Sequence, residues 1–385
     1  MNRSVCTGVI LTGLLLSAVH AHAQVGLDAE FAGFGARALG MGSAFIALSD
    51  DATASEYNPA GLVILERPEV AIQTSYRLDR HRELQPVSFG NWLGQGARGA
   101  APRENEYDSY WIPSFASFTY PTKWAVVSIC EYSPMYFKRS LTDSSGRYFI
   151  KRDWETQLTN YGVSVGFAPF SKLYLGTTLK YGDFRYRQRD TMSSGTFLNS
   201  LEGNSLGANF GFIWKMHPWF SLGGVYKTSQ NLAGSYASTR VHLKIPRTVG
   251  MGVAFHPNDR LRILADVDQI EWSEFMKERN TLEPNYDRDD VLRYHLGAEY
   301  LLKVFGEATP SPTALFVRCG AMREDSNRLY YHGTFEPLRK AFPKEEPINH
   351  LSCGLGVARS RYQLDFAVDE SSKGTQFILS TVLYF

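Results

Sequence analysis

The stretch "NYGVSVGF", Asn160–Phe167, decides the fold class. Tyr161, Val163, Val165 and Phe167 alternate with residues that are small or polar. Successive side chains of a β-strand point to opposite faces, so this period of two predicts a strand with one bulky apolar face. A helix would repeat its apolar residues every three or four positions. The stretch therefore predicts a strand that separates an apolar environment from a polar one.

The same alternation recurs from Pro68 to the end of the chain, where the last run finishes on Phe385. Counting such runs gives about 14 strands, of the 9–11 residues or more that a tilted membrane strand needs. We expect them at 68–78, 111–120, 123–134, 154–168, 172–186, 204–215, 219–228, 243–256, 260–270, 291–303, 312–323, 349–358, 361–368 and 375–385.

Short and long connections alternate between these strands. Tight turns follow strands 2, 4, 6, 8 and 12, for example at Pro121-Thr122 and Pro257-Asn258-Asp259. Long polar connections follow strands 1, 3, 5, 7, 9 and 11, at 79–110, 135–153, 187–203, 229–242, 271–290 and 324–348. Outer-membrane barrels have this asymmetry, whereas a soluble sandwich has no reason to gather its long loops at one end. The sequence therefore predicts an all-β fold, a 14-stranded antiparallel transmembrane β-barrel in a bacterial outer membrane.

Length and composition agree with one large barrel. The chain has 385 residues and a formal net charge of +1. Such a chain has no excess of Lys and Arg for a broad phosphate-binding surface, so we expect no nucleic-acid partner. After Cys6, the cysteines Cys130, Cys319 and Cys353 show neither CxxC nor Cys/His spacing. We therefore predict no disulfide framework and no cysteine metal site.

The N-terminus has the features of a secretory signal peptide. Arg3 supplies the positive region, Val9–Val19 the apolar region, and Ala21-His22-Ala23 a small-residue cleavage site. The apolar run is too short to span a bilayer as a helix. We expect residues 1–23 to be removed and the mature chain to be exported with Gln24 first.

Residues 24–67 lack sustained alternation and are rich in Gly and Ala. A segment this short cannot build its own core, and its Phe31, Phe34, Met41 and Phe45 need a larger surface to cover them. The lumen of a large barrel can enclose a plug. We therefore predict a hatch at 24–67 that plugs the lumen, followed by the barrel at 68–385.

Two stretches carry a family resemblance. "GARALGMGSAFIALSDDATASEYNPAGL" (35–62) resembles the N-terminal hatch of FadL/TodX-type outer-membrane transporters for long-chain fatty acids and other hydrophobic compounds. "IPRTVGMGVAFHPNDRLRILADVDQIEWSEF" (245–275) is similar to that family's paired central strands. The expected strand number also agrees with the family's 14-stranded barrel. The resemblance covers the whole mature chain.

The resemblance implies passive passage without catalysis, cofactor or metal. A hydrophobic, fatty-acid-like small molecule would be caught by the external loops, pass a lumenal site beside the hatch, and leave sideways at a kink in strand 3. Pro134, at the end of the expected third strand, is the candidate for that kink; it is an equal candidate for the start of the loop. Candidate hatch or gate residues are Asp50, Asp51, Asn58, Pro59, Ala60 and Gly61, and candidate ligand-path residues are Phe31, Phe34, Phe45, Trp92, Tyr330 and Phe335.

A second interpretation stays open. The same scaffold and hatch occur in PorV-like proteins, which are partner subunits in protein secretion, so a protein partner is the alternative to a small molecule. A continuous apolar path with a gap beside strand 3 would favour transport. A sealed wall with an apolar loop surface would favour the partner role.

The carboxylates do not form a recognisable chemical site. Asp50 and Asp51 lack the alternating spacing of a calcium loop, and in the mature chain no two histidines have metal-ligand spacing. No nucleophile with an ordered histidine is visible, so we predict no enzyme. Asp266 and Asp268 are expected to face the lumen and to pair with arginines, for which Arg37, Arg262 and Arg318 are the candidates.

Overall fold

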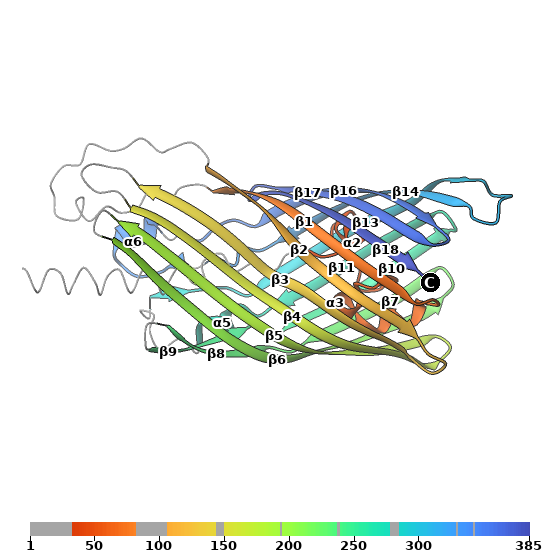
Figure 1. Ribbon diagram of the computed structural model, residues 1–385, viewed down its shortest axis with the longest axis horizontal. Helices are drawn as coiled ribbons and strands as arrows, with labels where there is room; N and C mark the ends of the chain where they lie inside the picture. Colours follow the sequence, from red (N-terminus) through yellow and green to blue (C-terminus); the bar gives the residue numbers. More distant parts are fainter. Residues whose placement is uncertain are drawn as a thin grey trace, which may run out of the picture.

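The computed structural model describes residues 33–81, 106–143, 150–192, 195–236, 239–277, 285–328, 330–341 and 343–385. They form a long barrel with the C-terminus at the end where the tight turns lie (Figure 1). We call this the turn end and the opposite one the external end. The barrel segments are β1 (Glu69–His81), β2 (Glu106–Pro121), β3 (Val126–Asp143), β4 (Ile150–Phe170), β5 (Leu173–Met192), β6 (Gly195–His217), β7 (Phe220–Lys227), β8 (Gln230–Tyr236), β9 (Thr239–Ile245), β10 (Thr248–Asn258), β11 (Leu261–Ile270), β13 (Val291–Phe305), β14 (Thr313–Glu324), β16 (Ile348–Arg359), β17 (Tyr362–Ser371) and β18 (Gly374–Tyr384).

All neighbours in the barrel are antiparallel, and the first and last strands, β1 and β18, pair along their length. The β5–β6 pairing closes the ring. β7 and β8 are two parts of one membrane strand, and so are β9 and β10, which Pro246-Arg247 separates. The barrel therefore has 14 strands, as the sequence predicts.

The outer face of the barrel is apolar over a broad band. Exposed large side chains such as Leu179, Leu206 and Leu351 point away from the lumen. Tyrosines, including Tyr181 and Tyr294, mark the external edge of the band. An apolar belt bordered by aromatic rings is the surface that lipid requires. Among the described residues, no helix is long and apolar enough to cross a membrane.

Several strands run further toward the external end than predicted. The third strand does not end at Pro134 but continues to Asp143, and the loops predicted at 187–203 and 229–242 are largely strand. Many outward residues there are polar, as Arg187 and Glu202 are, so the contrast between apolar and polar faces weakens although the backbone stays paired. The external end also carries α5 (Ser273–Lys277), α6 (Glu336–Ala341) and a small sheet of β12 (Tyr286–Asp287) and β15 (Tyr330–Tyr331).

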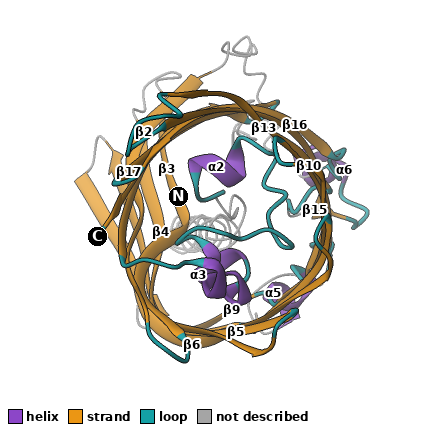
Figure 2. Ribbon diagram, turned by 90° about the vertical axis from the view of Figure 1, so that its right-hand side faces the viewer, coloured by secondary structure: helices purple, strands orange, loops and turns teal. Residues whose placement is uncertain are grey.

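Residues 33–67, called the hatch segment here, lie inside the barrel. They contain the short helices α2 (Ala36–Leu39) and α3 (Ala54–Tyr57) and the 3-10 helix η1 (Pro59–Ile64). Figure 2 shows α2 and α3 within the ring of strands. The backbone of the hatch segment packs directly against the backbone of the wall. A Cβ atom on Gly320 of β14 would lie only 2.0 Å from the Gly42 nitrogen. Glycine at this inward position thus lets two backbones touch.

Candidate functional site

The end of the hatch segment is fixed by Asn58, whose side chain is fully buried. Its Oδ1 accepts from Ala60 N at 3.2 Å, which caps η1, and Pro59 occupies the first helical position. Its Nδ2 donates to Ile46 O at 2.8 Å and to Phe212 O in β6 at 3.0 Å. A Cβ on Gly61 would lie 2.0 Å from Ser49 O. One amide side chain thus joins the turn, the rest of the hatch segment and the wall.

Asp50 and Asp51 have different partners. Asp50 forms an ion pair with Arg37, with 2.5 Å between Arg37 Nη1 and Asp50 Oδ1. Asp51 Oδ1 accepts from Thr53 N at 2.8 Å and so closes the turn into α3. Burial raises the pKa of Asp51 to about 6, against the opposing effect of Arg37.

Glu299 of β13 joins the hatch segment to the wall. Its carboxylate accepts from Arg37 Nε at 2.8 Å, from Arg262 Nη1 at 2.6 Å and from Arg318 Nε at 2.7 Å. Glu299 is 2% exposed, so this cluster has little solvent to replace a lost partner. The sequence did not single out Glu299, because only the folded barrel brings three arginines from separate segments to it.

Of the two lumenal aspartates, Asp268 does pair with an arginine of the wall, but the named candidates Arg37, Arg262 and Arg318 are wrong. Asp268 pairs with its cross-strand neighbour Arg293, with 2.7 Å between Asp268 Oδ1 and Arg293 Nε. Asp266 Oδ2 accepts from Phe45 N at 2.6 Å and from Ile46 N at 2.8 Å. Both aspartates do lie inside the barrel, but register and not sequence distance selects their partners.

A third attachment lies on α3. Glu56 accepts from Lys227 Nζ at 2.7 Å and from Asn209 Nδ2 at 3.0 Å. Lys180 of β5 lies 3.9 Å from Glu56 Oε2. Burial alone would raise the pKa of Glu56, but Lys227 and Lys180 outweigh it and lower this pKa to about 2.

This attachment predicts a pH dependence. A depressed carboxyl pKa stabilises the folded state fully above the ordinary pKa of 4.5 and loses that contribution as pH falls toward 2. The contribution is on the order of 3 kcal/mol. Asp51, which closes the turn into α3, has a raised pKa of about 6 and titrates in both wild type and Glu56→Gln. We therefore expect the difference between them in protection of the Tyr57 and Asn58 amides from hydrogen exchange to be constant from about pH 7 to pH 5 and to shrink below that. A difference that does not change with pH would contradict the assignment.

A cavity of about 130 Å³ lies between the hatch segment and the external half of the barrel. The hatch segment contributes Phe34, Ile46 and Glu56 to its lining, and the wall contributes, among others, Pro134 and Lys180. Most of the charged lining residues are matched in ion pairs, such as Asp268 with Arg293. The volume is well below the roughly 300–1,000 Å³ that enclose a whole drug-sized ligand. The cavity suits a small polar group and not a long apolar chain.

In this lining, the ion pair of Lys180 with Glu56 is long and contains no hydrogen bond. Its side chain is 6% exposed. Within the described residues its ammonium makes no hydrogen bond, since Glu56 at 3.9 Å is beyond hydrogen-bond reach. A buried ammonium has three donors to satisfy. Lys180 therefore presents unused donors to the cavity.

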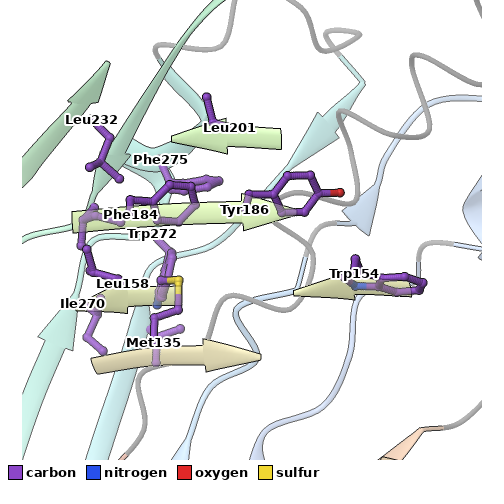
Figure 3. Close-up of a cluster of buried hydrophobic side chains, with 12 residues drawn as sticks. Met135, Trp154, Leu158, Phe184, Tyr186, Leu201, Leu232, Ile270, Trp272 and Phe275 are labelled. Carbon is purple, nitrogen blue, oxygen red and sulfur yellow. The ribbon is translucent and has the colours of Figure 1, made fainter. Parts of the chain in front are cut away.

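A cluster of buried apolar side chains, called the lumenal apolar cluster here, packs inside the external half of the barrel. Figure 3 shows side chains of several strands, among them Leu158 and Phe184, together with Trp272 and Phe275 beside and on α5. Ile245 belongs both to this cluster and to the cavity lining. The complete set is Met135, Trp154, Leu158, Phe184, Tyr186, Leu201, Leu232, Ile245, Ile270, Trp272, Phe275 and Val291, with Phe137 against it.

The β2–β3 pairing stops part of the way up the wall. It runs from Pro121↔Val126 to Phe115↔Tyr132, and no ladder joins the described residues 106–114 of β2 to 133–143 of β3. β3 has a register shift between Tyr132 and Met135, which places Pro134 in a bulge. Above it the edges meet through side chains, with Tyr110 and Tyr136 ring centroids 5.3 Å apart. This part of the wall, called the β2–β3 gap, has no backbone ladder. Two long hydrogen bonds cross it, from Tyr110 Oη to Tyr136 O at 3.5 Å and from Ser140 N to Asp108 Oδ2 at 3.4 Å.

The structure separates the candidate ligand-path residues. Phe34 lines the cavity, whereas Phe45 is fully buried in the hatch segment, 5.5 Å from the Tyr57 ring. Tyr330 donates to Asp289 Oδ1 at 3.0 Å in the external region, and Phe335 is exposed; neither lines the cavity. Phe31 and Trp92 lie outside the described residues.

Sequence reasoning missed Lys180 and the lumenal apolar cluster. The alternation at 154–158 and 184–186 was a signal, because large apolar residues there fall on the inward face, where a polar lumen was expected. Among the described residues, no group of His, Cys, Asp and Glu side chains is arranged to hold a metal ion.

No family model and no curated protein matches the sequence. Solved structures do match the fold. A FadL homologue of Pseudomonas aeruginosa aligns with a TM-score of 0.70 at 14% identity, over 93% of this chain and 100% of that one. The toluene transporter TodX of Pseudomonas putida gives 0.63 at 13% identity, over 92% and 99%. The toluene transporter TbuX of Ralstonia pickettii gives 0.61 at 12% identity, over 92% and 98%. The chain has the fold of these FadL- and TodX-type outer-membrane channels.

Proposed function

We propose that this chain is an outer-membrane channel that passes hydrophobic small molecules, long-chain fatty acids in particular, without catalysis. The ligand enters from the external end, places its polar head in the cavity, and leaves sideways into the membrane through the β2–β3 gap. The hatch segment closes the route along the barrel axis, and Asp50, Asp51 and Asn58–Gly61 hold it in place. The fold shared with hydrophobic-compound channels supports the general class.

The position of Pro134 carries the proposal. This residue lines the cavity and also lies in the bulge where the β2–β3 ladder ends. The next residue, Met135, belongs to the lumenal apolar cluster. Cavity, apolar cluster and gap therefore meet at two successive residues. A molecule with an apolar tail can move from the cluster to the gap without breaking a backbone ladder.

The hatch segment supports a lateral exit because it is strongly attached. Three buried polar attachments, centred on Glu299, Glu56 and Asp266, would have to break before it moved. Breaking one buried pair costs about 3–5 kcal/mol. Parting the gap requires separation of the Tyr110 and Tyr136 rings and the loss of two long hydrogen bonds between side chain and backbone, which contribute roughly 0.5–1.5 kcal/mol each.

The position of Lys180 favours a ligand with an acidic head group over a neutral hydrocarbon ligand. Its ammonium is buried, borders the cavity and has unused donors. Phe184, four residues after Lys180 on β5, belongs to the lumenal apolar cluster. The two residues are about 13 Å apart along the backbone. A carboxylate on Lys180 with an alkyl chain toward Phe184 matches a fatty acid.

Lys180→Met tests this specificity. We expect about tenfold weaker binding of a long-chain fatty acid to the purified barrel, because a charge-assisted hydrogen bond contributes roughly 1.5–3 kcal/mol. Uptake of toluene into vesicles that contain the barrel should not change. Lys172→Met, in an exposed turn, is the matched control and should bind as the wild type does.

Equal fatty-acid binding by wild type and Lys180→Met would refute the role of Lys180. Absence of any hydrophobic ligand and of any uptake would refute transport altogether. In that case the PorV-like partner role, for which a sealed wall was the expected sign, would regain support. The early end of the β2–β3 ladder favours transport between the two.

A further inference from the structure

Beyond transport, one strand carries a row of arginines on its outer surface. Arg185, Arg187 and Arg189 occupy alternate positions of β5 and are all exposed. Alternate residues of a strand share a face, and successive members lie about 7 Å apart. The intervening Phe184 and Tyr186 are buried in the lumenal apolar cluster, so the arginines point away from the lumen.

Two of these guanidinium groups have no partner among the described residues. Arg185 pairs with Asp183 at 2.6 Å, but within the described part of the chain no ion pair or hydrogen bond involves Arg187 or Arg189. Their cross-strand neighbours on β4 are Glu155 and Asp153.

Both neighbouring carboxylates on β4 are engaged elsewhere. Glu155 accepts from Tyr136 at 2.8 Å. Asp153 accepts from Ser140 Oγ at 2.6 Å and forms an ion pair with Lys151 at 3.5 Å. On the other side, Arg187 and Arg189 face Ser200 and Leu198, while Glu202 lies opposite Arg185. Lys138, exposed on β3 across from Glu155, adds a further cation.

The height of Arg187 and Arg189 above the apolar belt limits which lipid headgroups can reach them. Tyr181 is the last exposed large apolar side chain of β5 toward the external end. Arg187 lies six residues beyond it, about 20 Å along the strand and about 15 Å in height at the usual tilt of roughly 40°. An ordinary phospholipid headgroup region is only about 5–8 Å deep on each side. A phosphorylated saccharide headgroup, which rises well above the hydrocarbon, reaches the pair.

We propose that Arg187 and Arg189 bind phosphate groups on the saccharide headgroup of an outer-leaflet glycolipid of the lipopolysaccharide kind. Guanidinium groups bind phosphate oxygens by paired, charge-assisted hydrogen bonds. β3 to β6 project as a long strip of wall at the external end (Figure 1), so the glycolipid would lie against the outside of this strip. The inference rests on the membrane placement in the proposed function, but not on the transported ligand.

The test measures binding of lipopolysaccharide with a phosphorylated core to the purified barrel in detergent. Arg187→Gln/Arg189→Gln should bind about 25-fold more weakly, because each arginine near an anionic lipid surface contributes a factor of about five. Arg260→Gln is the control, since Arg260 is exposed in the turn between β10 and β11, at the opposite end of the barrel. It should bind within about twofold of the wild type.

Two further measurements distinguish binding of the phosphorylated lipid from binding of free phosphate. Dephosphorylated lipopolysaccharide should bind the wild type as weakly as the intact lipid binds the double variant. Inorganic phosphate at the same phosphate concentration should compete poorly. Equal binding of intact lipid by wild type and double variant would overturn the proposal, and so would full competition by inorganic phosphate. Fatty-acid uptake should be the same in wild type and double variant, which keeps this test separate from that of transport.

Discussion

Deletion of Pro134 is expected to abolish lateral release of fatty acid while the barrel stays folded. β3 has one residue more than β4 between the pairs Tyr132↔Asn160 and Met135↔Leu158. Removing one residue there makes the strand regular. Met135 then follows Tyr132 by two positions, so both keep their inward faces and no other side chain changes sides. The β2–β3 ladder can then continue and close the gap with backbone hydrogen bonds.

Uptake of a fluorescent fatty acid into vesicles measures the effect. We expect the deletion variant to lose at least about 90% of wild-type uptake, because a closed ladder leaves no route through the wall. Pro134→Ala is the matched control, since it keeps the extra residue and hence the bulge, and it should retain most of the uptake. The migration of unheated barrel on gels checks folding. Wild-type uptake by a folded deletion variant would refute the lateral route.

Replacement of Glu299 by Gln is expected to loosen the hatch segment more than any other single change. The variant keeps the shape of the side chain but leaves Arg37, Arg262 and Arg318 around a neutral group. Removing one partner of a buried charge cluster costs about 3–5 kcal/mol. The Leu39 and Gly40 amides, which donate within α2, should exchange about 100-fold faster or more.

Glu370→Gln is the control for this variant. Glu370 pairs with Arg80 on the exposed surface, where the side chains are 38% and 47% exposed, and such pairs contribute about 0–1 kcal/mol. In Glu370→Gln, the Leu39 and Gly40 amides should exchange at the wild-type rate. Amides at the β10–β11 pairing should be equally protected in both variants, which shows that the barrel itself is intact. Unchanged protection of Leu39 in Glu299→Gln would remove Glu299 from its anchoring role.

Much of the fold follows from local pattern. Tyr161, Val163 and Phe167 alternate because one face of their strand meets lipid, and the structure exposes all three on the outer surface. The same reasoning is wrong at Pro134, where the sequence predicts the end of the strand and the structure continues it to Asp143. A bulge accommodates the missing N–H, and only the neighbouring strands determine whether the chain turns or continues.

The candidate site was less accessible to sequence reasoning. Asn58 and Asp50 belong to a recognisable stretch, and the structure gives each of them hatch or wall contacts; their role as a gate stays a proposal. Lys180 has no local signature, because its significance comes from burial beside Glu56 and the cavity. Arg187 likewise becomes notable only when its neighbours Glu155 and Asp153 bind other groups.

By itself, the sequence determined that this chain has a lipid-facing barrel wall, since side-chain alternation is a property of each strand and needs no partner. Tertiary structure alone decided where that wall is open and what holds its interior. The end of the β2–β3 ladder, the three arginines on Glu299 and the pairing of Asp268 with Arg293 all depend on register. Register is set by the closure of the whole ring, and a shift by one residue would send every one of these side chains to the other face.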